Sequence, residues 1–305
     1  MAINIQAIER YKIQPDSVKD GNYMGIKVLD SCIVDINRVD GEKFFGISGL
    51  EYDEKSDILY MLSDRGRLFT FKISLKDTKI NSLKPLHGYR VKDRFGRKFL
   101  KPHSDSEGLA LVGDELLISF ERYVRILRTN LKANGYKKKS IKLPKRLKNI
   151  KNFQGINGAL EALTYHPKYG ILTTGEFPLK GQDDGYQGIY NLTGEICKFK
   201  KDYFDNAVTG FETMNDGNLL ILQRDFNKRE FKTQITLKKL YLDEIKNGIC
   251  KTKNLAVMKS DDDWKLDNFE GIAHYKNNIY FMISDDNNFF LQKTILTMFE
   301  VVESK

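Results

Sequence analysis

A repeat that occurs five times is the feature that most restricts how this chain can fold. Each copy starts with a polar, a small and a bulky apolar residue, and it ends in a second apolar run that leads to another polar residue. The copies are SGLEYDEKSDILYMLSD from Ser48, EGLALVGDELLISFE from Glu107, EALTYHPKYGILTTGE from Glu161, TGFETMNDGNLLILQ from Thr209 and EGIAHYKNNIYFMISD from Glu270. The polar ends of a copy lie 14–16 residues apart, whereas successive copies start 48–61 residues apart. Constant inner spacing with variable outer spacing indicates a structural repeat with loop insertions.

Each copy is followed by further β-like runs, such as LFTFKISL at 68–75 and the more polar TKNLAVMK at 252–259. Four antiparallel strands in roughly 50 residues is the pattern of a β-propeller blade. The small second residue of each copy fits this fold, because innermost strands crowd around a central channel and a missing Cβ lets them approach. We therefore predict an all-β propeller with four antiparallel strands per blade, forming one domain over residues 1–305.

The number of blades depends on the 47 residues that precede the first copy. They contain two β-like runs, at 7–13 and 25–36. If one run completes the last blade as its outer strand, the ring has five blades. A degenerate sixth blade is the alternative. We favour the five-bladed propeller, in which an N-terminal strand closes the last blade.

Composition and charge restrict the class of protein less strongly. No apolar run approaches the roughly 20 residues that a membrane span requires, and the N-terminus lacks the pattern of a signal peptide. The three cysteines, an odd number, argue against a fully paired disulfide framework. A cytoplasmic protein and an exported protein in mature form both remain open, and we expect a monomer.

The net charge of +9 is concentrated in YKKKSIKLPKRLKNIK, residues 136–151. This segment is either a solvated outer strand and loop or a rim that attracts anions. It lacks regularly interleaved aromatic residues, so specific binding of nucleic acid is not expected.

The polar ends of the five copies are predicted to meet at one mouth of the propeller. In a β-hairpin the start of the first strand and the end of the second lie at the same edge. Three acids start first strands: Glu107, Glu161 and Glu270. Four acids end second strands: Asp64, Glu121, Glu176 and Asp285. Three arginines follow second strands directly: Arg65, Arg122 and Arg224.

Crowded carboxylates repel one another unless protons, arginines or a bound cation neutralise them. Hard oxygen ligands suit Ca²⁺ or Mg²⁺, and an arginine beside a metal can hold a phosphate oxygen. Alternatively, the acids bind loop backbones and lock neighbouring blades, and the arginines only pair with them. Other chemistries are poorly supported, since Leu50 breaks the GxSxG pattern around Ser48 and the four histidines lack ligand spacing.

The stretches SGLEYD, DSEGLAL, DNFEGIA and SDDNNF…QKTILTMFEV resemble the esterase-like phytase family of bacterial β-propeller proteins. The similarity extends from about residue 45 to 302 and implies phosphoesterase activity and a periplasmic or secreted location. By position it marks Glu107, Glu161, Glu270, Glu121 with Arg122, Glu176, Arg224, and Asp285 with Asn287 and Asn288. One departure is Gln223, because the fourth copy usually reads Glu-Arg in this family.

The leading hypothesis is a phosphoric ester hydrolase that uses a divalent metal, with Ca²⁺ favoured, and acts on a small phosphorylated or other anionic ligand. Glu176 would be the general base, Arg122 and Arg224 would clamp the phosphate, and Arg65 and Asn287 would contact the substrate. Six acids would hold the metal: Glu107, Glu161, Glu270, Glu121, Asp64 and Asp285. The alternative is a propeller that binds a ligand or partner without catalysis, with a structural metal or none. A lyase or sugar-acting propeller is a third idea.

Overall fold

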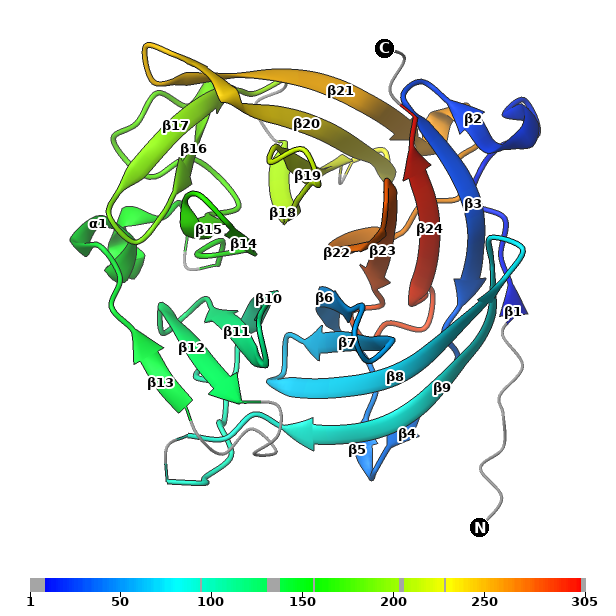
Figure 1. The fold of residues 1–305 in the computed structure, drawn as a ribbon, viewed down its shortest axis with the longest axis horizontal. Helices are drawn as coiled ribbons and strands as arrows, with labels where there is room; N and C mark the ends of the chain where they lie inside the picture. Colours follow the sequence, from blue (N-terminus) through cyan, green and yellow to red (C-terminus); the bar gives the residue numbers. More distant parts are fainter. Residues whose placement is uncertain are drawn as a thin grey trace.

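The computed structural model describes residues 9–93, 95–130, 138–155, 157–202, 206–227 and 229–302, and it is an all-β propeller (Figure 1). The first sheet contains β6 (Ile47–Asp53), β7 (Ile58–Ser63), β8 (Arg67–Lys76) and β9 (Lys79–Arg90). The second contains β10 (Ser106–Val112), β11 (Glu115–Phe120), β12 (Arg125–Asn130) and β13 (Lys138–Ile141). In both sheets each strand pairs antiparallel with the next one in the chain.

An eight-stranded sheet follows, in which two such four-strand runs meet at their outer edges. The first run contains β14 (Ala162–His166), β15 (Gly170–Thr174), β16 (Tyr186–Tyr190) and β17 (Glu195–Lys200). The second contains β18 (Ala207–Thr213), β19 (Leu219–Asn227), β20 (Lys232–Lys246) and β21 (Ile249–Lys259). A single parallel pairing of Lys198 with Ile249 joins β17 to β21.

The last sheet combines the two ends of the chain. It contains β22 (Asn268–Lys276), β23 (Ile279–Asp285), β24 (Ile295–Val301) and β3 (Ile26–Ile33), with β1 (Glu9–Arg10) and β2 (Asn22–Tyr23) beside β3. β3 pairs antiparallel with β24. The predicted run at 7–13 is reduced to β1, and residues 7 and 8 lie outside the described part of the chain. β4 (Arg38–Val39) and β5 (Glu42–Lys43) form a separate small hairpin.

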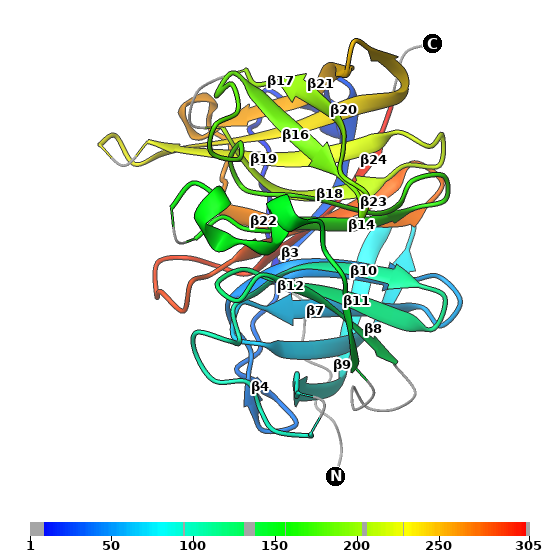
Figure 2. The same cartoon turned by 90° about the vertical axis from the view of Figure 1, so that its left-hand side faces the viewer.

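The first strand of each run lies nearest the centre, and later strands lie farther out (Figure 1). The inner strands contact one another in sequence order, and β22 also contacts β6. Figure 2 shows the β8–β9 and β20–β21 hairpins at opposite ends of the side view. Glycine permits the close approach: a Cβ at Gly108 would lie 2.6 Å from Cβ of Leu163, and one at Gly210 would lie 2.6 Å from the carbonyl oxygen of Glu270.

The apolar core lies between neighbouring four-strand runs. Between the first and second sheets, Leu62 of β7 and Leu68 of β8 cluster with Ile118 of β11. The same type of buried cluster recurs at the other boundaries, including the one between β7–β8 and β23–β24, where Phe69 and Phe281 belong to one cluster. Burial of apolar side chains against the next sheet is therefore what holds the ring together.

The basic segment is mostly solvent-exposed where it is described. Residues 136 and 137 lie outside the described residues, Lys138–Ile141 is the outermost strand β13, and α1 spans Lys145–Lys148. Strand β13 does not extend to Pro144, which has no N–H for a strand ladder and instead precedes the first helical residue. Leu143 and Leu147 anchor the segment in the core. This is the arrangement of a solvated outer strand.

A disulfide joins Cys197 of β17 to Cys250 of β21, and Cys32 is the remaining free cysteine, which is buried. The sequence did not predict this pairing. Within the described residues, no helix has the length and apolar character needed to cross a membrane.

Loss of the disulfide is expected to destabilise the protein substantially. The two cysteines are 53 residues apart, and closing a loop of that size in the unfolded chain is worth about 4 kcal/mol. Urea unfolding of the Cys197→Ala, Cys250→Ala double variant should show a loss of this order. A reducing agent should weaken the wild type to the same extent and leave the double variant unaffected. An unchanged wild type under reduction would contradict the prediction.

Candidate carboxylate site

The inner hairpins bring the ends of the repeated segments to a common edge. The backbone N–H of Asp64, which follows β7, donates to the carbonyl of Gly46 before β6 at 2.8 Å. In the second sheet, Glu121 donates in the same way to Asp105 at 2.9 Å, and in the third Glu176 donates to Gly158 at 2.9 Å. The acid that ends each second strand is therefore fixed beside the entry to the first strand.

A break in strand register lies at the repeated polar residue in four of the inner hairpins. The pairing shifts between Ile47 and Gly49, between Ser106 and Leu109, between Val208 and Gly210, and between Phe269 and Gly271. Such a bulge leaves the extra residue out of the ladder and re-aims its side chain. The polar-small pair that starts each of these copies is thus the sequence signature of a bulge. It explains how Glu107 and Glu270 leave the regular inside-outside alternation of a strand.

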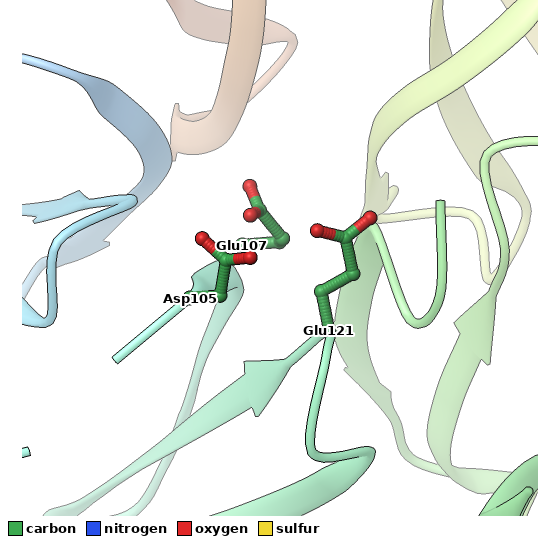
Figure 3. A group of neighbouring side chains, drawn as sticks. All are labelled: Asp105, Glu107 and Glu121. Atoms are coloured by element: carbon green, nitrogen blue, oxygen red, sulfur yellow. The ribbon is translucent and has the colours of Figure 1, made fainter. Parts of the chain in front are cut away.

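Three carboxylates lie close enough to share one cation. Asp105, Glu107 and Glu121 each offer an oxygen atom, and the three oxygens lie within 4.8 Å of one another (Figure 3). Asp105 was not among the metal-binding candidates predicted from the sequence. Its signal was present, since it stands two residues before Glu107, at the entrance to the same strand.

The remaining acids surround this group. The pKa of Glu107 is raised well above its usual range, first by burial and then by Glu161, Glu121, Glu270 and Asp64. The pKa of Glu161 is also well above its usual range, first because of burial and then because of Glu176. The structure therefore brings together the three first-strand acids, which come from three different sheets.

The acids that end second strands share these surroundings. Burial, followed by the charge of Asp105, raises the pKa of Glu121 to about 8. Burial and the nearby Glu270 raise the pKa of Asp285 to about 8. Burial raises the pKa of Asp64 to about 6, although Arg65 opposes the shift. The mouth thus disfavours the ionised form of several carboxylates, as expected for crowded acids.

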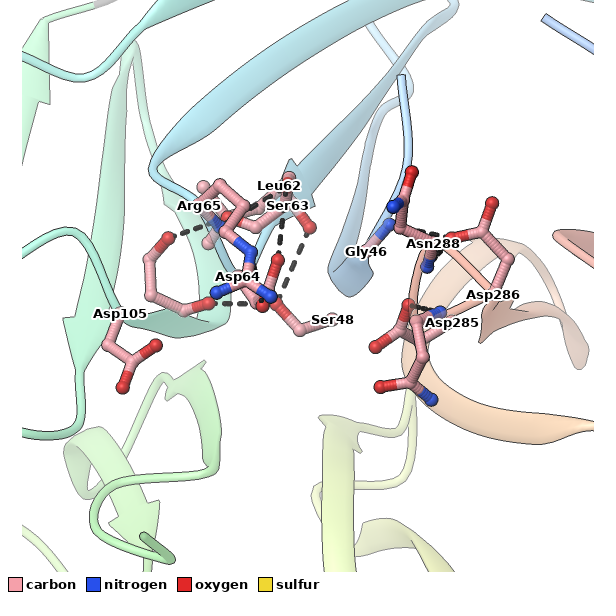
Figure 4. Close-up of polar contacts among 12 residues, drawn as sticks. Gly46, Ser48, Leu62, Ser63, Asp64, Arg65, Asp105, Asp285, Asp286 and Asn288 are labelled. Carbon is pink, nitrogen blue, oxygen red and sulfur yellow. Dashed lines mark hydrogen bonds and ion pairs between the residues drawn. The ribbon is translucent and has the colours of Figure 1, made fainter. Parts of the chain in front are cut away.

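Each predicted arginine pairs with an acid. Nε of Arg65 lies 3.1 Å from Asp64 (Figure 4), and Nε of Arg122 lies 2.7 Å from Asp105. Arg224 bridges two sheets, because its guanidinium lies 2.8 Å from Glu270 and 3.6 Å from Glu176. Burial alone would lower the pKa of this arginine, but the two carboxylates outweigh burial and raise it.

Glu107 and Glu161 differ from the acids that pair with arginines, because neither accepts a hydrogen bond or ion pair from any residue that the structure describes. Elsewhere in the propeller, acids that join neighbouring strands do accept hydrogen bonds. Glu51 accepts from the N–H of Tyr52 at 3.0 Å and from that of Leu111 on the neighbouring inner strand at 2.8 Å. Glu212 accepts from the hydroxyl of Thr164 at 2.8 Å. Locking acids are therefore saturated with donors, whereas these two carboxylates at the mouth are not.

Other polar residues of the repeat have structural contacts. The hydroxyl of Ser48 donates to the carbonyl of Ser106 at 2.8 Å, and that of Thr209 donates to Phe269 at 3.1 Å, so both join adjacent inner strands. Gln223 is fully buried, and neither atom of its amide has a hydrogen-bond partner within the described chain.

The loop after β23 completes this edge of the propeller. The backbone N–H of Asn287 donates to Asp285 at 2.6 Å, while the exposed side chain of Asn287 bonds to Gln292 at 3.2 Å. Asp286 accepts from the N–H of Gly46 at 2.9 Å, which ties the loop to the first sheet (Figure 4).

A sequence profile for a family described as "Phytase-like: Esterase-like activity of phytase" matches residues 42–289. A search of curated proteins found no match. Solved structures with similar folds include a glutaminyl cyclase from Myxococcus xanthus, at 11% identity and TM-score 0.49, covering 91% of this chain and 97% of that one. The PQQ-bound aldose sugar dehydrogenase of Streptomyces coelicolor has 10% identity and TM-score 0.48, covering 90% and 98%. A catalytically inactive virginiamycin B lyase from Staphylococcus aureus, with quinupristin, has 11% identity and TM-score 0.44, covering 90% and 100%.

Proposed function

Because this chain belongs to the phytase-like family, which is described by an esterase-like activity, we propose that it is a metal-dependent phosphoester hydrolase acting at the carboxylate mouth. The observation that carries the proposal is that the carboxylates of Glu107 and Glu161 lack hydrogen-bond donors among the described residues. Both are only partly exposed and lie close to other acids, yet no described residue donates to them. Crowded carboxylates repel one another unless they are neutralised, so a cationic ligand is the simplest partner for this pair.

The donor set fits a divalent cation. Asp105, Glu107 and Glu121 supply oxygens within mutual reach, and oxygen donors of this kind suit Ca²⁺. The buried amide of Gln223 is a further polar group without a hydrogen-bond partner among the described residues. We assign Asp105 to the metal in addition to the six acids that the sequence indicated. When bound, such a cation polarises a phosphoryl oxygen and lowers the pKa of a bound water.

The residues of the chain itself would hold the substrate and move the proton. Arg224 is fixed by carboxylates on two sides, so its planar fork is pre-organised for a phosphate. Arg122, held by Asp105, would contact a second phosphate oxygen. Glu176 is the proposed general base, since burial raises its pKa even though Arg224 opposes the shift, and a base with a raised pKa accepts a proton better near neutrality. Arg65 and Asn287 would contact the rest of the substrate.

The proposal treats the molecule as a five-bladed propeller. Five four-strand runs can be counted if the eight-stranded sheet is divided at its single parallel pairing and β3 is taken as the outer strand of the last blade. The closed sequence of contacts among the inner strands supports this division. The disulfide is compatible with an extracellular protein, so we also propose a periplasmic or secreted location.

The test of the proposed function is turnover of p-nitrophenyl phosphate and bis(p-nitrophenyl) phosphate by protein stripped with EDTA and then supplied with calcium. Hydrolysis should require the metal, and Glu176→Gln should abolish it without preventing metal-dependent stabilisation. Absence of turnover of both esters with Ca²⁺, Mg²⁺ and other divalent metals supplied would reject the hydrolase.

A binding propeller without catalysis is the second candidate, and the ion pairs of the arginines favour it. All three arginines at the mouth already have carboxylate partners, and Gln223 replaces an acid of the family pattern. Calcium-dependent stabilisation of a protein that hydrolyses neither ester would support this candidate over the hydrolase.

A further inference from the structure

A polar cavity with a mostly cationic lining lies next to the carboxylate mouth. Its volume is about 350 Å³. Four cationic side chains and one carboxylate contribute to its lining: Arg38, Lys43, Arg67, Arg90 and Glu42. Asn288, from the loop that follows Asp285, also lines it.

The fold assembles this cavity from three segments that are distant in sequence. The β4–β5 hairpin supplies Arg38, Glu42 and Lys43, while Arg67 at the start of β8 pairs in register with Arg90 at the end of β9. Arg67 is also an electrostatic neighbour of Asp64. The cavity therefore adjoins the carboxylate mouth, although its lining is distinct.

Glu42 contacts three cationic side chains, but it does not provide an acceptor for all of their N–H groups. One oxygen of Glu42 accepts from Nε of Arg67 at 3.3 Å and from Nε of Arg90 at 3.0 Å, and the other oxygen lies 3.8 Å from Nζ of Lys98. A single carboxylate thus fixes two guanidinium groups through their Nε atoms. The terminal nitrogens of both guanidinium groups are left outside these contacts.

Arg67 provides the strongest evidence that the cavity binds an acceptor. The residue is only 7% exposed, and its Nη1 atom is buried without a hydrogen-bond partner among the described residues. Its guanidinium also lies 4.8 Å from the ring centre of Phe45, another residue of the cavity wall. A buried donor without an acceptor costs free energy, so this arrangement is best explained by an acceptor that the protein does not supply.

We propose that this cavity binds an oxyanion of the phosphate class, with Arg67 as its central donor. The planar guanidinium fork matches the oxygen geometry of phosphate, and the surplus of cationic side chains favours a multiply charged anion. The inference does not depend on the proposed hydrolysis, because its residues are separate from the acids and arginines assigned to the mouth.

The test is calorimetric titration of EDTA-treated protein with inorganic phosphate, so that no metal at the mouth takes part. The wild type should bind one phosphate per chain. Arg67→Lys keeps the charge but loses the fork, and it should weaken binding roughly tenfold. Lys43→Ala, at an exposed position of the cavity, should weaken binding roughly threefold and retains the fold even if Arg67→Lys does not.

Lys72→Ala is the matched control, because it removes an equal charge from an exposed position of β8 outside the cavity. This variant should bind phosphate like the wild type. Three results would overturn the proposal: no saturable binding by the wild type, binding that Arg67→Lys and Lys43→Ala leave unchanged, or equal weakening by Lys72→Ala and Lys43→Ala. Failure of ester hydrolysis alone would leave these results unaffected, so the two proposals are tested separately.

Discussion

Replacing Arg224 with methionine is expected to lower the free energy of unfolding by about 3 kcal/mol and to abolish ester hydrolysis. The guanidinium of Arg224 lies 2.8 Å from Glu270 and 3.6 Å from Glu176, and its side chain is 21% exposed. Its removal would leave two shielded carboxylates without their cation. Removing one partner of a buried pair is costly for this reason.

The control for this prediction is Arg128→Met, the same substitution in the more exposed pair with Glu115, whose atoms are 3.2 Å apart. An exposed ion pair contributes under about 1 kcal/mol. Arg224→Lys should recover much of the stability but little of the activity, because a lysine restores the charge without the planar fork. Equal effects of Arg224→Met and Arg128→Met on urea unfolding would show that Arg224 does not hold the mouth together.

Without metal, the protein is expected to lose stability as the pH rises from 5 to 8. Burial raises the pKa of Glu121 and that of Asp285 to about 8 in the folded state. Over this interval the folded protein binds more protons than the unfolded chain, so the free energy of unfolding must fall with pH. Stability is fully present below the ordinary carboxylate pKa of about 4 and is lost as the pH passes the raised values. Because a tenfold change in proton affinity corresponds to about 1.4 kcal/mol, the loss should be at least about 3 kcal/mol.

Calcium should change this pH profile, since metal ligands bind in their deprotonated form. Urea unfolding at several pH values, with EDTA or with excess calcium, measures the effect. With calcium the loss between pH 5 and 8 should shrink or reverse, and Glu121→Gln should flatten the EDTA profile. Identical profiles with EDTA and calcium would argue against a cation at the mouth, and a flat EDTA profile would argue against crowded carboxylates.

The fold was largely predictable because the repeat reports on local structure. In four of the five copies, the polar-small-apolar start corresponds to an inner strand with a bulge. The β-like run at 252–259 lies within β21. The approach of the acids from separate sheets could be inferred for the same reason. Their roles in catalysis and metal binding remain predictions.

Features that depend on how distant four-strand runs and hairpins meet could not be inferred in this way. The Cys197–Cys250 disulfide requires two outer strands of different four-strand runs to meet. The cavity around Arg67 requires the β4–β5 hairpin to lie beside the β8–β9 pair. Asp105 is an intermediate case, because its position before Glu107 was visible in the sequence but its proximity to Glu121 depends on the hairpin.

The most direct measurement is a crystal structure of the protein grown with calcium, with anomalous data collected to identify the ion. Our account predicts an ion at the mouth with oxygens of Asp105, Glu107 and Glu121 among its ligands, at about 2.3–2.6 Å. A mouth without an ion, in which these carboxylates are instead protonated and bonded to one another or to arginines, would contradict it.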